Sequence, residues 1–339
     1  MHTTALVLGL SALLSGAAQA AYTLETTYDS TNFFEEFNMF DGEDPTHGFV
    51  EYVDYQTAAQ DGLAGSKDGA IYMGVDSTTS NPANGRKSVR VESQKSWTHG
   101  LFISDIAHMP GSIAGVWPAL WLFGPSWPSS GEIDIIEGVN TQEKNTVTLH
   151  TSEGCSITND GSMSSSTLKE TDCNTDNAGT GCGMDTADNS NYGDGFNDIG
   201  GGVYAMEWTS QAISVWFFQR SQIPSDINSE KPDPSNWGQP VAKFNGGSGC
   251  DIDTHFKNQN LIVDTTFCGD WAGASEVWNN NAETKALADT CEDYVANNPS
   301  AFAEAYWSIN SIKVYQQGAS NYTSPYASRR SYIRKPYLA

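Results

Sequence analysis

The segment Gly131–Gly138 constrains the fold of this 339-residue chain more than any other. It reads Gly-Glu-Ile-Asp-Ile-Ile-Glu-Gly, so three acids stand among three isoleucines. Isoleucine-rich segments form buried strands, whereas a carboxylate that is buried without partners is costly. A strand with one face in a core and the other face wet accommodates both kinds of side chain. The segment therefore predicts a strand that borders a hydrophobic core on one side only.

The spacing of the acids predicts an irregularity within this strand. Glu132 and Asp134 are two residues apart and share a face, but Glu137 is three residues beyond Asp134 and would point the other way in a regular strand. One extra residue, accommodated as a β-bulge near Ile135–Ile136, returns Glu137 to the acidic face. We expect Ile133 and one of the two consecutive isoleucines to anchor the strand in the core. Mutual repulsion would then force the pKa values of the three carboxyl groups apart.

Three carboxylates on one face fit three different uses. Glycoside hydrolysis needs one ionised and one protonated carboxyl group near the working pH. A strand edge can also carry acids for solubility, and three carboxylates suit a hard cation. The residue pattern alone leaves these alternatives open.

Charge and cysteine content restrict the partners and the compartment. The formal net charge of −24 repels nucleic acid and anionic membranes, but it tolerates a neutral ligand such as an uncharged polysaccharide. The six cysteines are even in number, and in a secreted chain they predict disulfides with fifteen possible pairings. The sequence holds no CxxC pair and no HExxH element, so we expect no zinc site.

The two ends of the chain differ from its middle. An apolar run, Ala5–Leu14, is followed by small residues up to Ala20, which predicts a signal peptide over residues 1–20 and a secreted protein. No other apolar stretch is long enough to span a bilayer. We expect one catalytic domain over residues 21–317, because no internal repeat and no linker rich enough to separate two domains is found in the sequence. A basic extension is expected over residues 318–339, with a glycosylation sequon at Asn321.

Short apolar runs between turn-rich segments predict an all-β sandwich or barrel. One helix is expected at Glu283–Val295. Two long insertions, Glu153–Gly202 and Ser221–Asp253, contain cysteines and are expected to be stapled by disulfides. The expected strands are Phe33–Phe40, Ala70–Val75, Ser88–Val91, Leu101–Ile106, Val116–Phe123, Val147–His150, Val203–Trp208, Ile213–Phe218, Leu261–Phe267 and Tyr306–Tyr315.

Tryptophans flank the acidic segment. Trp117, Trp121 and Trp127 precede it, and Trp271 lies in a later region. Aromatic faces stack on the apolar faces of sugar rings, so tryptophans near a carboxylate cleft are typical of carbohydrate binding. Three others lie inside apolar strands and are expected in the core: Trp208, Trp216 and Trp307.

These motifs resemble the fungal laminarinase-like members of glycoside hydrolase family 16. The resemblance rests on the Glu-x-Asp-x-x-Glu pattern of Gly131–Gly138, on Trp117–Trp121 ahead of it, and on His150 thirteen residues after Glu137. Further segments match in order: Ser88–Arg90, Glu207–Thr209, Asp264–Trp271 and Trp307–Tyr315. The resemblance extends from about Tyr28 to Tyr315. The extra residue in the acidic pattern matches the laminarinase-type branch of the family.

The resemblance implies a concanavalin A-like jelly roll, a sandwich of two antiparallel sheets with a concave substrate cleft. It implies a retaining mechanism in which Glu132 is the nucleophile, Glu137 the acid/base and Asp134 an assisting group. It also implies substrate contacts from the four cleft tryptophans, His150 and Arg90. No catalytic metal or cofactor is implied; some members bind a structural calcium away from the active site, and we predict no ligands for it.

The expected activity is endo-hydrolysis of β-1,3-glucans, and of mixed β-1,3/1,4-glucans, by a secreted monomer that binds neither nucleic acid nor membranes. Two alternatives remain open. A transglycosylase would use the same fold and the same acids, with a sugar in place of water as the acceptor. A non-catalytic β-glucan-binding protein is disfavoured because all three acids are present.

Overall fold

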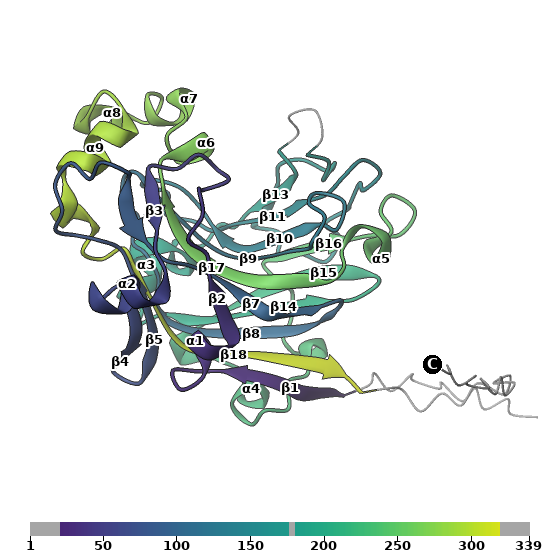
Figure 1. The fold of residues 1–339 in the computed structure, drawn as a ribbon. Coiled ribbons are helices and arrows are strands. Elements are labelled where there is room, and N and C mark those ends of the chain that lie inside the picture. The colour runs from purple at the N-terminus through teal and green to yellow at the C-terminus, as the bar shows by residue number, and fades with distance from the viewer. Residues whose placement is uncertain (1–20, 176–179, 319–339) are drawn as a thin grey trace, which may run out of the picture.

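The computed structural model describes residues 21–175 and 180–318, which form two eight-stranded antiparallel sheets (Figure 1). The expected signal peptide and residues 319–339 of the basic extension, including Asn321, lie outside the described residues. No helix among the described residues is long and apolar enough to cross a membrane. The expected all-β sandwich is confirmed.

The first sheet is built around its longest strand, β18. Along one edge β18 pairs with β8, and along the other it pairs with β5 near its start and with β1 near its end. The strand order is β16 (Ala242–Asn245), β15 (Ala212–Gln219), β14 (Gly202–Trp208), β8 (Gly100–His108), β18 (Tyr306–Gln317), β5 (Ala70–Gly74) and β4 (Ala64–Lys67), with β1 (Tyr22–Tyr28) beside β18.

The second sheet contains the acidic segment as a central strand. Its order is β12 (Thr167–Leu168), β13 (Cys182–Asp185), β11 (Thr146–His150), β10 (Glu132–Glu137), β9 (Val116–Phe123), β17 (Gln259–Phe267), β7 (Arg90–Trp97) and β2 (Phe37–Met39). A small parallel pair, β3 (Val50–Tyr52) and β6 (Arg86–Ser88), lies outside both sheets.

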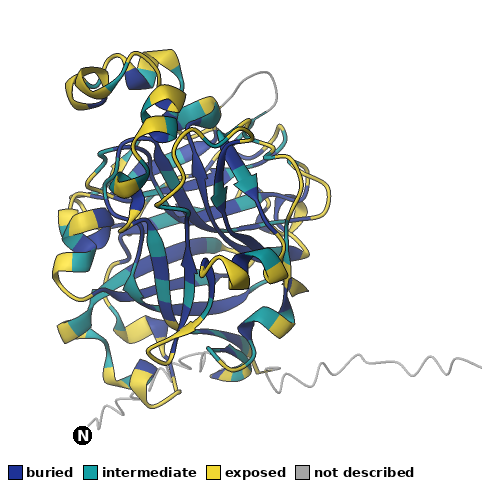
Figure 2. Cartoon of the chain, turned by 60° about the vertical axis from the view of Figure 1, so that its left-hand side comes forward, coloured by how far each residue is buried: buried dark blue, intermediate teal, exposed yellow. Residues whose placement is uncertain are grey.

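The core lies between the two sheets. Buried side chains of the first sheet, such as Phe102 and Trp307, belong to the same hydrophobic cluster as Leu120, Ile133 and Leu149 of the second. Figure 2 shows the strands mostly buried and the connecting segments exposed. The expected core tryptophans Trp208 and Trp307 belong to this cluster, whereas Trp216 is buried in a separate one with Leu101 and Tyr315.

The helices are short and lie in the connections. They are α1 (Phe33–Glu36), α2 (Tyr55–Gln60), α3 (Gly193–Asp198), α4 (Ser225–Asn228), α5 (Ile252–His255), α6 (Gly269–Ala272), α7 (Ser275–Trp278), α8 (Ala282–Leu287) and α9 (Cys291–Asn297). Helices α6 to α9 gather at one end of the sandwich (Figure 1). There they cover a separate hydrophobic cluster that includes Phe267, Trp278 and Val295.

The single helix expected at Glu283–Val295 is wrong, because the chain breaks between α8 and α9. Ala288 is extended, and Thr290 caps α9 by accepting the N–H of Asp293. Cys291 is tied to Cys268 by a disulfide. A side-chain cap and a covalent link therefore start a new helix where the sequence pattern suggested continuity.

The expected strand Phe33–Phe40 begins instead as a helical turn. The N–H groups of Glu35 and Glu36 donate to the carbonyl of Asn32, and the rings of Phe33 and Phe37 stack 4.1 Å apart. This contact four residues apart favours the turn, so only Phe37–Met39 is a strand. The expected strand Ser88–Val91 is also divided, between β6 and β7.

Three disulfides use all six cysteines. Cys155–Cys250 joins the two long insertions to each other, and Cys173–Cys182 closes a short loop within the first of them. The third links Cys268, which follows β17, to α9. The expectation that the insertions are stapled is confirmed.

Candidate active site

A cavity of about 870 Å³ lies on the face of the second sheet that points away from the core. Strands β9, β10, β11 and β17 form its floor. The expected site residues all line it: Glu132, Asp134, Glu137, His150, Arg90, Trp117, Trp121, Trp127 and Trp271.

The predicted bulge explains how three acids reach one face. Asp134 pairs with Thr148 of β11 and Glu137 pairs with Thr146, so β10 uses one more residue than its neighbour between the two pairs. On the other side, the register against β9 shifts between Asp134 and Ile136. The expectation that only one of the consecutive isoleucines is buried is wrong, because Ile135 and Ile136 are both within the core. In a bulge two residues oppose one, and here both supply core side chains.

Hydrogen bonds hold the carboxyl groups of Glu132 and Glu137 in the cavity, and an ion pair with His150 holds that of Asp134. Trp127 Nε1 donates to Glu132 Oε2 at 2.6 Å, and Trp117 Nε1 donates to Glu137 Oε1 at 2.9 Å. His150 Nε2 lies 3.2 Å from Asp134 Oδ2 and 3.7 Å from Glu132 Oε1. Tryptophans thus contribute N–H donors to the acids as well as aromatic faces to the cavity.

The acids and the histidine have strongly shifted pKa values. Burial, and then the charge of Asp134, raises the pKa of Glu132 to about 7 and that of Glu137 well above its usual range. Burial also raises the pKa of Asp134, although the interaction with His150 lowers it in part. Burial alone would lower the pKa of His150, but its bond to Asp134 and the nearby acids raise it to about 9. At neutral pH the cluster therefore contains a histidine cation and at least one protonated carboxyl group.

The same histidine bears on metal binding. Among the described residues, ligand atoms of Glu132, Asp134 and His150 come within 4.8 Å of one another, close enough to surround an ion. A histidine ligates a metal through its neutral ring, whereas the raised pKa of His150 keeps it a cation near neutral pH. In its protonated form, His150 therefore pairs with these acids instead of ligating a metal.

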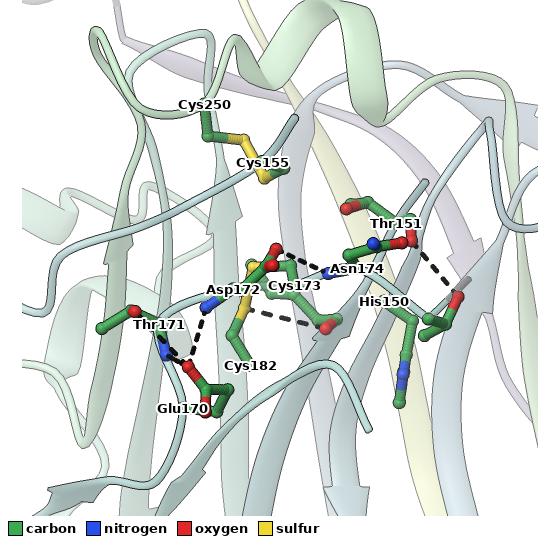
Figure 3. The surroundings of a disulfide bond; sticks show 12 residues. His150, Thr151, Cys155, Glu170, Thr171, Asp172, Cys173, Asn174, Cys182 and Cys250 are labelled. Atoms are coloured by element: carbon green, nitrogen blue, oxygen red, sulfur yellow. Dashed lines mark hydrogen bonds between the residues drawn. A yellow bond between two sulfur atoms is a disulfide. The ribbon is translucent and has the colours of Figure 1, made fainter. Parts of the chain in front are cut away.

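Gly181 supports the ring of His150 from the insertion. Figure 3 shows the Cys173–Cys182 disulfide beside this histidine, and Cys182 pairs with Leu149 on β11. Gly181 has a φ of +74°, and a Cβ there would lie 2.5 Å from His150 Nδ1. Only glycine therefore fits between the disulfide-bonded loop and the imidazole.

Arg90 has a different position from the tryptophans. Its guanidinium donates to Glu92 Oε1 at 2.8 Å and lies over the rings of Phe40 and Trp121, and the residue is only 5% exposed. Arg90 is thus beneath Trp121 and orients that ring. Trp127, in contrast, is 53% exposed at the cavity edge, and Trp271 meets Trp117 edge to face.

Asp264 also lines the cavity, although no role was predicted for it from the sequence. Its carboxylate accepts from Trp121 Nε1 at 2.8 Å and from the Tyr52 hydroxyl at 3.0 Å. Burial raises the pKa of Asp264 to about 6, although Arg90 opposes the shift. An aspartate inside the apolar strand Gln259–Phe267 was the signal that could have identified it.

A carboxylate cluster in a tryptophan-lined cavity on one sheet of a β-sandwich defines the class of protein as a glycoside hydrolase. Residues 37–315 match the model of the XgeA-like catalytic domain of glycoside hydrolase family 16. The chain belongs to this family.

Relatives support the assignment. An endo-1,3(4)-β-glucanase of Arthroderma benhamiae is 46% identical, over 94% of this chain and 70% of its own length. A probable endo-1,3(4)-β-glucanase of Aspergillus fumigatus is 47% identical, again over 94% of this chain. The chain spans only 50% of that second relative.

Two solved structures share the fold at high identity. An elongating family 16 β-1,3-glucosyltransferase is 46% identical with a TM-score of 0.80, and it covers 87% of this chain and 100% of its own. Laminarinase 16A from Phanerochaete chrysosporium is 41% identical with a TM-score of 0.81, and the match covers 88% of this chain and 100% of the laminarinase chain. That laminarinase was solved with 6-O-glucosyl-laminaritriose in its donor and acceptor sites.

Proposed function

We propose that this chain is a secreted, retaining endo-β-1,3(4)-glucanase that acts on laminarin-type and mixed-linkage glucans. The observation that carries the proposal is the bulge of β10, which brings Glu137 onto the face of Glu132 and Asp134 inside the cavity. The glucanase names of the relatives support the substrate class. The net charge of −24 suits a neutral polymer and disfavours nucleic acid and anionic membranes as partners. We propose that the enzyme acts as a monomer.

In the first step, the carboxylate of Glu132 attacks the anomeric carbon while the carboxyl of Glu137 gives its proton to the departing oxygen. The pKa of Glu137, raised well above its usual range, keeps that proton available. The cation of His150 lowers the pKa of Glu132 and so favours the ionised nucleophile. Asp134 lies between Glu132 and Glu137 on β10, and its carboxyl group holds His150.

In the second step, Glu137 is a carboxylate and takes a proton from water, which attacks the glycosyl–Glu132 ester and releases the sugar with its original anomeric configuration. Indole faces at the cavity wall give the glucose rings apolar surfaces to stack on, chiefly Trp127 and Trp271.

The test is a reducing-end assay on laminarin and lichenan with Glu132→Gln and Glu137→Gln. We expect losses of about 10³-fold or more for each, because each removes a group that acts in the transition state. Glu25→Gln, on an exposed position of β1, is the matched control. Near-normal activity of either cavity variant overturns the assignment. Early product with the α configuration, seen by proton NMR, rules out retention.

A transglycosylase is the second candidate, because the relative described as an elongating β-1,3-glucosyltransferase is 46% identical to this chain. It would use the same two steps with a sugar hydroxyl in place of water. Mass spectrometry of products from laminarihexaose distinguishes the two. Oligosaccharides longer than the substrate favour transfer, and shorter ones alone favour hydrolysis.

A further inference from the structure

The bulge of β10 leaves part of the strand without partners in register. Between the pairs Asp134–Thr148 and Glu137–Thr146, the residues Ile135 and Ile136 share a single opposing residue on β11 and are not paired in register. Backbone polar groups inside a protein need hydrogen-bond partners. An irregular strand at this depth persists only if something else satisfies those groups.

One side chain does so on both sides of the bulge. Asn145 Nδ2 donates to the carbonyl of Ile135 at 2.8 Å, and Asn145 Oδ1 accepts the N–H of Glu137 at 2.9 Å. Asn145 is completely buried. A primary amide offers a donor and an acceptor side by side, so one residue bridges the bulge at Ile135 and Glu137.

Asn145 is itself fixed by the first insertion. Its N–H donates to Asn191 Oδ1 at 3.1 Å, and its carbonyl accepts from the hydroxyl of Thr186 at 2.9 Å. Asn191 Nδ2 then donates to Thr186 Oγ1 at 2.7 Å. All three side chains are buried. A network that is fully paired holds one geometry, so the amide of Asn145 has little freedom to follow a shift of β10.

We propose that Asn145 is a positioning residue for Glu137: its amide maintains the bulge that directs this carboxyl group into the cavity. The inference rests on the proposed role of Glu137 as acid/base. The bond from Trp117 fixes the carboxyl end of Glu137, and Asn145 fixes its backbone end. A side chain held at both ends is set in direction as well as in place.

Loss of the amide leaves the bulge free to relax toward a regular strand. The carboxyl of Glu137 would then move away from the leaving-group oxygen. Displacement of a catalytic group by about 1 Å costs about 10²-fold in rate, and a general acid contributes about 10²- to 10⁴-fold. We therefore expect Asn145→Ala to reduce kcat/KM on laminarin by about 10²-fold or more, up to the loss seen with Glu137→Gln.

The discriminating measurement compares two leaving groups. A sugar hydroxyl needs a proton as it departs, whereas dinitrophenolate leaves as an anion and needs none. We expect Asn145→Ala to lose far less kcat/KM on 2,4-dinitrophenyl β-laminaribioside than on laminarin, in the same sense as Glu137→Gln. Partial unfolding would lower both rates equally, because it removes active enzyme without regard to the leaving group.

Asn140 provides a matched control. It is a buried asparagine whose Oδ1 accepts the N–H of Gly115 at 2.8 Å and whose Nδ2 donates to the carbonyl of Ala272 at 3.0 Å. Asn140→Ala removes the same two kinds of bond without touching the bulge. Its ratio of laminarin to aryl activity should equal that of wild type. An equal ratio for Asn145→Ala, in folded protein, overturns the proposal.

Asn145→Asp keeps the proposal testable if Asn145→Ala does not fold. A buried carboxyl group is neutral in acid, because burial raises its pKa. In that form it can accept from Glu137 and donate to Ile135 as the amide does. We expect a wild-type activity ratio at acid pH, and an altered ratio there contradicts the inference. If Glu137→Gln itself shows no preference between leaving groups, the proposed function fails instead.

Discussion

Replacement of Gly181 by alanine tests the electrostatic coupling between His150 and the acids. A Cβ at this position would lie 2.5 Å from both His150 Nδ1 and the carbonyl of Leu149, so the imidazole has to move. The φ of +74° also opposes a side chain, at a cost of about 1–2 kcal/mol in the left-handed region. We therefore expect lower stability together with a displaced His150 ring.

The magnitude follows from the charged contact between His150 Nε2 and Asp134 Oδ2, which lie 3.2 Å apart. A hydrogen bond to a charged group contributes about 1.5–3 kcal/mol. At about 1.4 kcal/mol for each factor of ten, its complete loss from the transition state lowers kcat/KM by about 10- to 150-fold. The sign of the pH effect is also defined. The charge of His150 lowers the pKa of Glu132, so displacement of the ring raises that pKa, and the acidic limb of the activity profile moves to higher pH.

The assay is kcat/KM on laminarin from pH 3 to 9, together with thermal unfolding. Gly183→Ala is the control, because a Cβ there meets Thr148 Oγ1 and Thr146 Cγ2 only at 3.6 and 3.7 Å, ordinary contact distances. The reasoning is refuted if Gly181→Ala loses stability but keeps the wild-type acidic limb, or if both glycine variants shift the limb equally.

Three further predictions concern the cavity and the disulfides. Trp127→Phe removes the N–H that lowers the pKa of Glu132, so the acidic limb of the kcat/KM profile should move to higher pH while KM changes less than in Trp127→Ala. Replacement of Cys155 and Cys250 by serine removes a disulfide that spans 95 residues, which loop entropy makes worth about 4.7 kcal/mol. The Cys173–Cys182 disulfide spans 9 residues and is worth about 2.6 kcal/mol on the same basis. Denaturant titration should therefore show the larger loss of unfolding free energy when the longer link is removed. EDTA should change the rate of laminarin hydrolysis by less than about twofold, because protonated His150 pairs with Asp134 and Glu132 and does not ligate a metal. A large loss of activity that calcium restores would contradict this prediction.

The bulge of β10 could be predicted from sequence, because the isoleucines of this strand need a core and its three acids need one shared polar face. Glu132, Asp134 and Glu137 cannot share a face without an inserted residue, so their spacing alone predicted the bulge. The burial of both Ile135 and Ile136 was not predicted, since a period-two pattern assigns one of two neighbours to each face. Which side chains a bulge directs inward depends on its local geometry.

Asn145 could not have been identified in the same way. Its role depends on its position immediately before β11, beside the bulge, and that position follows from strand register rather than from local pattern. The break between α8 and α9 depends in part on a local cap, by Thr290, and in part on a distant disulfide partner, Cys268, that is 23 residues from Cys291. Long-range contacts override local propensity in both cases.

The place of β18 in the first sheet bears on how the chain folds as it is synthesised. This strand lies between β8 on one side and β5 and β1 on the other, yet among the described strands it is the last to leave the ribosome. Until β18 is synthesised, the edges of β8, β5 and β1 that will pair with it have no partner strand. Exposed strand edges are prone to associate with other chains. Any factor that shields these edges until residue 317 emerges should raise the yield of folded protein, whereas chains that stop before residue 306 should aggregate.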